Sequence, residues 1–123
     1  MANISGVGAL FIHANEPSAL AEWYQSKLGF GFSHSPSDNS HYGELRDPAS
    51  GLTVYLAIVP AKTELPYGNR GMMVNYKVNE FDVFVAKLQK SGVTIEKRRG
   101  DGASKFAYIS DPEGNPIELW SGV

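Results

Sequence analysis

The sequence contains no cysteine among its 123 residues. Disulfide bonds, thiolate nucleophiles and cysteine-ligated zinc or iron–sulfur centres are therefore excluded. An excess of positive charge is also missing, because the formal net charge is −2 and the isoelectric point is about 5.9. The one dense basic run, Lys97–Arg99, is followed at once by Gly100 and Asp101. Nucleic acid is accordingly not an expected partner.

Long apolar runs are absent as well. The N-terminal segment MANISGVGALFI has no basic region before its apolar stretch, and that stretch is shorter than the roughly 20 residues needed to cross a bilayer. We therefore expect no membrane association and a cytoplasmic location. The chain is long enough to bury one core but too short for two independent cores. We predict a single domain over residues 1–123.

What the sequence does contain is an internal repeat with an offset of about 64 residues. In the first copy, the apolar run 9–14 predicts a strand, and the segment 15–18, with its proline, predicts the start of a helix that ends at Gly29. The second copy has the same order, with a strand at 73–78 and a helix that ends before Gly92. The two halves are thus expected to share one topology.

The later parts of the two halves also match. Asp47-Pro48 with Gly51 precedes a strand over 52–58, and Asp111-Pro112 with Gly114 precedes a strand over 116–120. Asp-Pro followed by glycine is typical of a turn between two strands. We therefore predict an α+β fold in which two βαβββ modules form curved mixed sheets around a cleft. The modules are expected at about 4–60 and 70–121, connected by 61–69.

Two segments carry a family resemblance. WYQSKLG at 23–29 and FAYISDPEGNPIELW at 106–120 resemble the helix end and the C-terminal signature of the vicinal-oxygen-chelate superfamily. That superfamily contains glyoxalases, bleomycin resistance proteins and extradiol dioxygenases. The resemblance implies paired modules, a concave site, often a divalent metal held by residues from four strands, and frequent homodimers. It does not imply one reaction.

The resemblance implies four metal-ligand positions, and most of them hold residues of another type in this sequence. The first-strand positions are Ala9 and Met73, and the late-strand positions are Tyr55 and Glu118. Only Glu118 keeps a ligand type of the family, and one carboxylate with a phenol does not complete a divalent metal site. We therefore expect a degenerate metal site and no cofactor, with a divalent metal as the lesser alternative.

Strand alternation predicts which side chains face the cleft. The predicted surface is a mixture of polar and apolar groups suited to a small organic ligand with an anionic or carbonyl group. Three residues on this surface are candidates for catalysis. His13 could act as a general base, Lys77 could stabilise an oxyanion, and Glu118 could transfer a proton. Candidate ligand-binding residues are Phe11, Tyr55, Met73, Asn75 and Trp120.

Plain structural roles remain open for these residues. Lys77 and Glu118 could pair with each other, and His13 could be an ordinary hydrogen-bonded strand residue. Tyr55 and Trp120 could serve packing alone. The other two histidines, His34 and His41, lie in or beside the polar segment 33–40. We interpret that segment as a surface loop.

Three functions remain open. The preferred one is a glyoxalase-like protein that binds a small organic ligand without a metal, with or without turnover. The alternatives are a non-catalytic drug-binding protein of the bleomycin resistance type and a metal-dependent lyase, isomerase or dioxygenase with ligands drawn from His34 or His41. A homodimer is expected from family habit alone.

Overall fold

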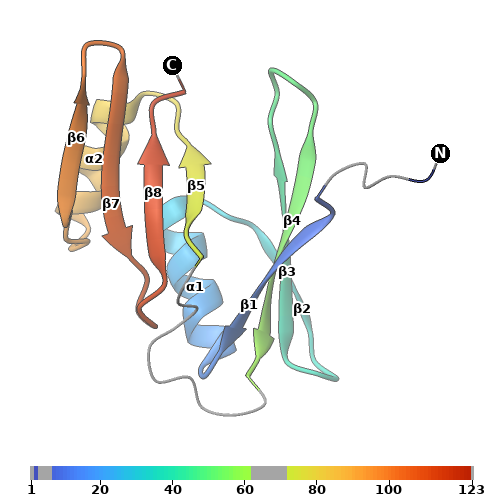
Figure 1. Ribbon diagram of the computed structural model, residues 1–123. Coiled ribbons are helices and arrows are strands. Elements are labelled where there is room, and N and C mark those ends of the chain that lie inside the picture. The colour runs from blue at the N-terminus through green and yellow to red at the C-terminus, as the bar shows by residue number, and fades with distance from the viewer. Residues whose placement is uncertain (1, 3–6, 62–71, 123) are drawn as a thin grey trace. The chain divides into compact units, whose positions relative to one another are not determined.

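The computed structural model describes residue 2 and residues 7–61 and 72–122 (Figure 1). The chain divides into two compact units, Met1–Pro66 and Tyr67–Val123. The predicted connection 61–69 lies outside the described residues, apart from residue 61. No helix in the described part of the chain is long and apolar enough to cross a membrane.

Both units have the predicted βαβββ order, and each forms a four-stranded mixed sheet with one helix. The elements are β1 Ala9–Ala14, α1 Pro17–Leu28, β2 Phe32–Ser35, β3 Ser40–Arg46, β4 Thr53–Pro60, β5 Val74–Lys77, α2 Phe81–Lys90, β6 Lys97–Asp101, β7 Ser104–Ser110 and β8 Pro116–Trp120.

The strands are arranged in the same way in the two sheets. In the first sheet the order is β1-β4-β3-β2, and in the second it is β5-β8-β7-β6. The first and last strands of each unit pair in parallel, whereas the other pairs are antiparallel. The predicted α+β class is confirmed.

The helix limits follow from local sequence. Pro17 occupies the first turn of α1, where its missing N–H costs nothing, and Gly29 ends the helix with φ of 82°. In α2 the N-cap is Glu80, whose φ of 51° is rare for a residue with a side chain. Gly92 lies beyond the end of α2 with φ of 94°. Both glycine stops predicted from the sequence are therefore present.

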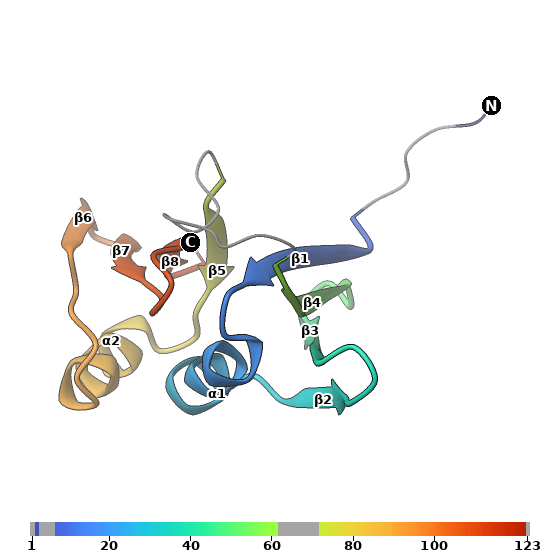
Figure 2. The same cartoon turned by 90° about the horizontal axis from the view of Figure 1, so that it is seen from below.

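Each helix covers one face of its own sheet (Figure 2). α1 buries a stripe of side chains, which are Leu20, Ala21 and Tyr24, and α2 buries Phe81, Val85 and Leu88. Their spacing of three or four residues is the helical period. The strands supply the opposing layer with alternate residues, among them Leu56 and Ile58 of β4 and Ile117 and Leu119 of β8.

The segment 33–40 is not a loop, contrary to our prediction. Residues 32–35 form β2, which pairs with β3 from residue 40 onward, so that only the turn between them is irregular. Asn39 in that turn has φ of 54°, a conformation that asparagine tolerates better than most residues. The polar composition that suggested a loop belongs instead to an edge strand, where polar side chains are common.

The Asp-Pro turn of the second unit is held by a buried carboxylate. Asp111 Oδ1 accepts hydrogen bonds from the backbone N–H of Glu113 at 2.9 Å and of Asn115 at 3.0 Å. Its Oδ2 accepts from Asn115 Nδ2 at 2.7 Å. Asp111 and Asn115 are 5% and 6% exposed. The turn therefore fixes the start of β8 with charge-assisted bonds shielded from water.

The repeat offers a matched test of this turn. Asp111→Ala should lower the free energy of unfolding by about 3 kcal/mol, because it leaves buried donors without their acceptor. The equivalent Asp47 accepts from Ala49 N and Ser50 Oγ in an exposed setting, so Asp47→Ala should cost only about 1 kcal/mol. Urea unfolding of both variants measures the difference. Equal losses would show that burial of the Asp111 carboxylate is unimportant.

Candidate functional site

A row of polar side chains crosses the second sheet on the face that points away from α2. The register places Asn75 of β5 opposite Glu118 of β8, and Glu118 opposite Tyr108 of β7. Arg99 of β6 lies opposite Phe106, two residues from Tyr108. Residues opposite one another in a sheet share a face. Four strands thus contribute to one polar row.

These side chains form a continuous network of hydrogen bonds. Asn75 Nδ2 donates to Glu118 Oε1 at 2.7 Å. The Tyr108 hydroxyl donates to Glu118 Oε2 and accepts from Arg99 Nε at 2.7 Å. Arg99 Nη2 also lies 3.7 Å from Glu118 Oε2. Both carboxylate oxygens of Glu118 are therefore occupied, and the orientation of Tyr108 is fixed from two sides.

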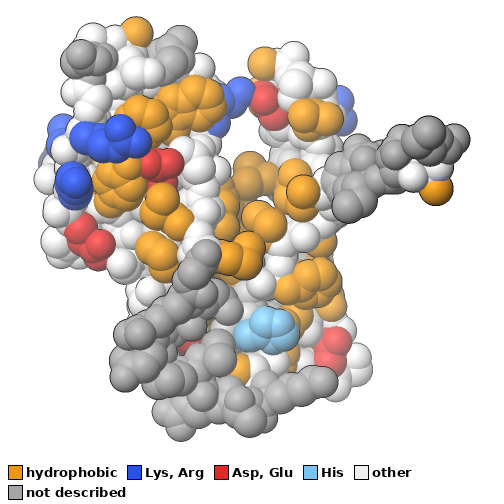
Figure 3. Space-filling view, in the orientation of Figure 1, with side chains coloured by type: hydrophobic (Ala, Val, Ile, Leu, Met, Phe, Trp, Pro, Cys, Tyr) orange, Lys and Arg blue, Asp and Glu red, His pale blue; other side chains and the backbone are white. Residues whose placement is uncertain are grey.

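The guanidinium group at the end of the row keeps access to solvent. The side chain of Arg99 is 55% exposed, whereas that of Glu118 is 13% exposed. The guanidinium carbon of Arg99 lies 4.5 Å from the centre of the Phe106 ring, a cation–π contact. Hydrophobic, basic and acidic side chains lie close together on this part of the surface (Figure 3). Arg99 can therefore present N–H groups to a ligand beside an aromatic ring.

The network sets the charge states of its two ionisable ends. The hydrogen bond from Tyr108 holds the pKa of Glu118 below its ordinary value of 4.5, and the bond from Asn75 and the charge of Arg99 act in the same direction. The same Tyr108 hydroxyl raises the pKa of Arg99. A carboxylate that accepts hydrogen bonds on both oxygens is a weak base. Its arrangement suits it to orient donors better than to accept a proton.

Three members of this network were not among the candidates from the sequence. Tyr108 and Phe106 lie in the segment FAYIS, where they alternate with the buried Ala107 and Ile109. That alternation was readable and would have placed them on one face with Glu118. In the sequence Arg99 stands out only as part of the basic run 97–99. Neither the sequence alternation nor the charge could have shown that Arg99 reaches Tyr108.

The other predicted residues of the second unit lie near the same row. Lys77 of β5 lies opposite Trp120 of β8 and is exposed, like Asn75. Its Cγ and Cδ lie close to Gly122, where an added Cβ would come within 3.1 Å and 3.2 Å of them. Met73 precedes β5 and is 47% exposed. Glu118 takes its hydrogen bonds from Asn75 and Tyr108.

The predicted residues of the first unit lie on one face of its own sheet. Phe11 and Tyr55 are 58% and 48% exposed, although both are large and aromatic. They share the face of the first sheet that points away from α1, because β1 pairs in parallel with β4 and Ala9 lies opposite Tyr55. His13 lies on the same face opposite Val59 and is exposed. The alternation that we predicted for β1 holds, since Ile12 and Ala14 are buried.

The donor set does not fit the divalent metal of the resemblance. The register corrects one assignment, because His13 and Lys77 correspond in the repeat and pair with Val59 and Trp120. The first-unit counterpart of Glu118 is therefore Ala57, not Tyr55. Alanine supplies no donor, and each oxygen of Glu118 already accepts a hydrogen bond, from Asn75 or Tyr108, with Arg99 beside it. Within 7–61 and 72–122 there is no group of three or more His, Asp or Glu side chains that could hold a metal ion.

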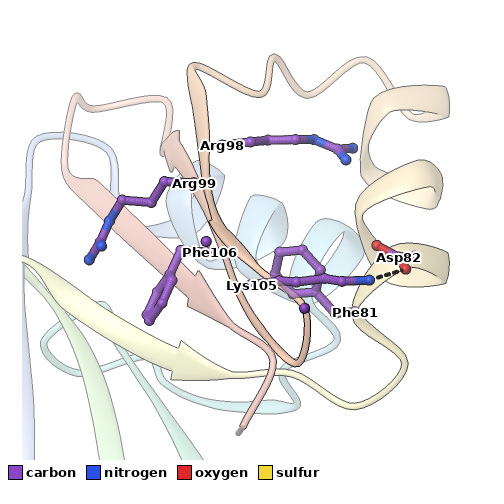
Figure 4. A pocket seen from close by; sticks show the side chains of 8 residues that line it. Phe81, Asp82, Arg98, Arg99, Lys105 and Phe106 are labelled. Carbon is purple, nitrogen blue, oxygen red and sulfur yellow. Dashed lines mark hydrogen bonds and ion pairs between the residues drawn. The ribbon is translucent and has the colours of Figure 1, made fainter.

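A separate hollow lies beside α2. It measures about 370 Å³ and is bounded by α2 and by the hairpin of β6 and β7. Arg98 points toward α2 there, and Lys105 Nζ pairs with Asp82 at 2.6 Å (Figure 4). Arg99 and Phe106 border it from the other side of the hairpin. The hollow is thus adjacent to the polar row but does not contain Tyr108 or Glu118.

Comparison with known proteins places this architecture in a family. Residues 6–119 match the model of the Glyoxalase/Bleomycin resistance protein/Dioxygenase superfamily. The chain belongs to this superfamily. Among curated proteins, none matches the sequence. The glyoxalase superfamily is the vicinal-oxygen-chelate superfamily that the segments at 23–29 and 106–120 resemble.

Several solved structures share the fold at low sequence identity. A glyoxalase family protein from Bacillus anthracis is 17% identical with a TM-score of 0.74, covering 98% of this chain and 97% of its own. TnmS3, an antibiotic binding protein from Streptomyces sp. CB03234, is 23% identical with a TM-score of 0.71 and 97% coverage of both chains. Oxidase ChaP-H2 is 18% identical with a TM-score of 0.71, covering 97% and 98%. At these identities the likeness shows the fold alone.

The polar row predicts a specific titration behaviour. Tyr108→Phe removes the strongest hydrogen bond to Glu118, so the pKa of Glu118 should rise toward 4.5. In the unaltered protein the contacts of Glu118 stabilise the fold above that pH, and this stabilisation should be lost as the pH falls through the lowered pKa. Carbon-13 NMR of the glutamate carboxyl groups measures both values. Tyr42→Phe, on the other unit, is the control and should leave Glu118 unchanged.

Proposed function

We propose that the chain binds a small organic ligand, bearing an anionic or carbonyl group and an apolar body, on the face of its second sheet that points away from α2. The observation that supports this most is the exposed guanidinium group of Arg99, fixed by Tyr108 and lying over Phe106. A guanidinium group held in this way can donate two parallel hydrogen bonds to a carboxylate, and it can donate to a carbonyl. Phe106 and Trp120 would pack against the apolar body.

The role that we assign to Glu118 is positioning rather than proton transfer. Its lowered pKa and its two occupied oxygens argue against a general base. It would instead orient Tyr108 and Asn75, whose remaining polar groups can meet a ligand. His13 and Lys77 are the candidates for catalysis that remain, one in each unit. Binding without turnover is the function that this arrangement supports best.

The ligand site is proposed to work without a divalent cation. At the positions where relatives of the superfamily hold metal, Ala57 offers no donor and the oxygens of Glu118 are already engaged. TnmS3 is an antibiotic binding protein, and a comparable binding role is our proposal here. An oxidase such as ChaP-H2 is the catalytic alternative.

Binding can be tested by tryptophan fluorescence, because Trp120 lies in β8 next to the polar row. Suitable probes are bleomycin and the hemithioacetal of methylglyoxal and glutathione, which represent two ligand classes of the superfamily and both carry carbonyl groups. Arg99→Gln should weaken binding of the preferred probe by roughly tenfold, as expected for a charged hydrogen bond. Arg98→Gln is the matched control, since Arg98 points toward α2 on the opposite face of the same strand. Equal effects of both variants would contradict the proposed face.

Turnover is tested separately with the same probes. In a binding protein, His13→Ala and Glu118→Gln should change affinity modestly and leave the probe chemically intact. Product formation by the unaltered protein, abolished by either variant with little change in affinity, would overturn the binding proposal in favour of catalysis. Mass spectrometry of the recovered probe distinguishes the two results.

A homodimer and a cytoplasmic location remain proposals. The exposed aromatic side chains of Phe11 and Tyr55 in the first unit favour a covering partner or ligand. Sedimentation velocity with and without the preferred probe would show which of the two covers them.

A further inference from the structure

The hollow between α2 and the hairpin of β6 and β7 carries cationic side chains that the polar row does not use. Arg98 of β6 and Lys105 of β7 both point from the sheet toward α2 (Figure 4). In the strand register Arg98 lies opposite Ala107, which is two residues from Lys105. The two cations are therefore diagonal neighbours on adjacent strands, a separation that long side chains can bridge. Two positive charges thus face one hollow of about 370 Å³.

The space between these two cations is kept free of side chains by the hairpin itself. Gly100 lies two residues from Arg98 on the same strand and directly opposite Lys105. Its φ is 102°, and a Cβ at this position would collide with the carbonyl oxygen of Ser104. Only glycine fits there without a shift of the backbone. The turn therefore demands a residue that leaves room for a ligand beside Arg98 and Lys105.

The positive charge of the hollow is only partly balanced within the protein. Lys105 Nζ donates to Asp82 Oδ2 at 2.6 Å. Arg99, at the border of the hollow, lies beside Glu118 on the other face of the sheet. Arg98 forms no ion pair or hydrogen bond within the part of the chain that the structure describes. An uncompensated guanidinium group thus lies in the hollow, although the whole chain has a net charge of −2.

The ion pair of Lys105 and Asp82 shows how an anion could be held there. The side chains of Lys105 and Asp82 are 41% and 67% exposed. Ion pairs in contact with water contribute little to stability, because solvent screens the attraction and two long side chains lose freedom. A ligand that offers more negative charge can therefore take the place of the Asp82 carboxylate. Asp82 Oδ2 already indicates where an anionic oxygen meets Lys105 Nζ.

We propose that this hollow binds the phosphate group of a small soluble phosphate monoester between Arg98 and Lys105. A phosphate monoester has three terminal oxygen atoms, so that it can accept two parallel hydrogen bonds from the guanidinium group and a third bond from the ammonium group. A carboxylate has only two oxygen atoms, and a guanidinium group that binds both leaves none for Lys105. The volume of the hollow is within the range of small-molecule sites. The site lies on the opposite face of the sheet from Glu118 and Tyr108 and does not depend on the ligand proposed there.

The test uses the full chain and glycerol 3-phosphate, which has no apolar body that would direct it to the polar row. Binding is followed by proton–nitrogen-15 NMR at a pH above about 7, where the phosphate carries close to two charges. Salt is kept at about 0.1 M so that distant charges are screened. We expect saturable shifts of the amide signals of Gly100 and Gly102, which border the hollow. Absence of saturable binding would overturn the proposal.

The unpaired arginine has a matched control on the adjacent helix. Arg98→Gln should weaken binding of glycerol 3-phosphate by roughly tenfold, because it removes a charged hydrogen-bond donor. Lys90→Gln removes the same charge from the exposed last turn of α2 and should leave the affinity unchanged. Equal weakening by both variants would indicate only general attraction of anions and would contradict the site.

A variant that should bind more tightly separates the proposal from damage to the fold. Asp82→Asn removes the carboxylate that competes for Lys105, so the affinity for glycerol 3-phosphate should rise by roughly two- to fivefold, the range expected for release of an exposed ion pair. Misfolding would not produce a gain. Unchanged or weaker binding would refute the role of Lys105.

Two further ligands identify the source of the phosphate group. Glycerate, in which a carboxylate replaces the phosphate, should bind at least about fivefold more weakly, since it lacks the third oxygen and the second charge. Equal affinity would overturn the assignment of phosphate. Vesicles that contain phosphatidic acid present the same glycerol phosphate as a lipid headgroup, and we expect the chain not to sediment with them. Sedimentation with the vesicles would assign the site to a membrane lipid and contradict a soluble ligand.

The outcome is distinguishable from that of the polar row. Bleomycin and the hemithioacetal carry no phosphate group, so Arg98→Gln remains the control for those probes. Binding of glycerol 3-phosphate that is lost in Arg99→Gln but kept in Arg98→Gln would place the phosphate on the polar row and overturn the second site.

Discussion

The structure of each unit depends on one constraint: a single helix covers only one face of a four-stranded sheet. The helix lies in the connection between the two edge strands of each sheet, from β1 to β2 and from β5 to β6, so the chain has to cross one face of the sheet there. Alternate residues of the strands then fill the core, while their neighbours remain on the far face. The aromatic and polar side chains on that far face are therefore a consequence of topology, and they are available for binding.

On the second sheet, the face away from the helix carries the polar row, and its donor set does not fit the divalent metal that the resemblance implies. Glu118 is the residue of the superfamily's ligand type that remains, and its two oxygens are occupied by Asn75 and Tyr108. A carboxylate so engaged needs no cation to compensate its charge, because Arg99 already lies beside it. The guanidinium group that balances Glu118 remains half exposed. The group that compensates the charge of Glu118 is therefore also the group that we propose to receive a ligand.

The two units have diverged in the chemistry of equivalent positions. The parallel register makes Ala57 the counterpart of Glu118 and Phe11 the counterpart of Asn75. At these two positions the first unit thus presents apolar side chains where the second presents polar ones. Its polar chemistry lies elsewhere, at the hairpin where His34 and His41 stack. An internal repeat preserves the backbone more strictly than it preserves the site, because turns and helix stops constrain φ whereas exposed face positions do not.

The sequence by itself determined the repeat, the helix stops at Gly29 and Gly92, the Asp-Pro turns and hence the α+β fold, because these depend on local backbone preference and on short periods. From residue types it also predicted a degenerate metal site, although the strand register moves one of the positions considered from Tyr55 to Ala57. Tertiary structure alone decided which side chains meet. Arg99 reaches Tyr108, and His34 stacks on His41, only through strand register, and a slip of one residue would reverse the face of each side chain. The segment 33–40 is a further example. Its polar composition predicted a loop, whereas residues 32–35 form a strand because β3 supplies the hydrogen-bond partners.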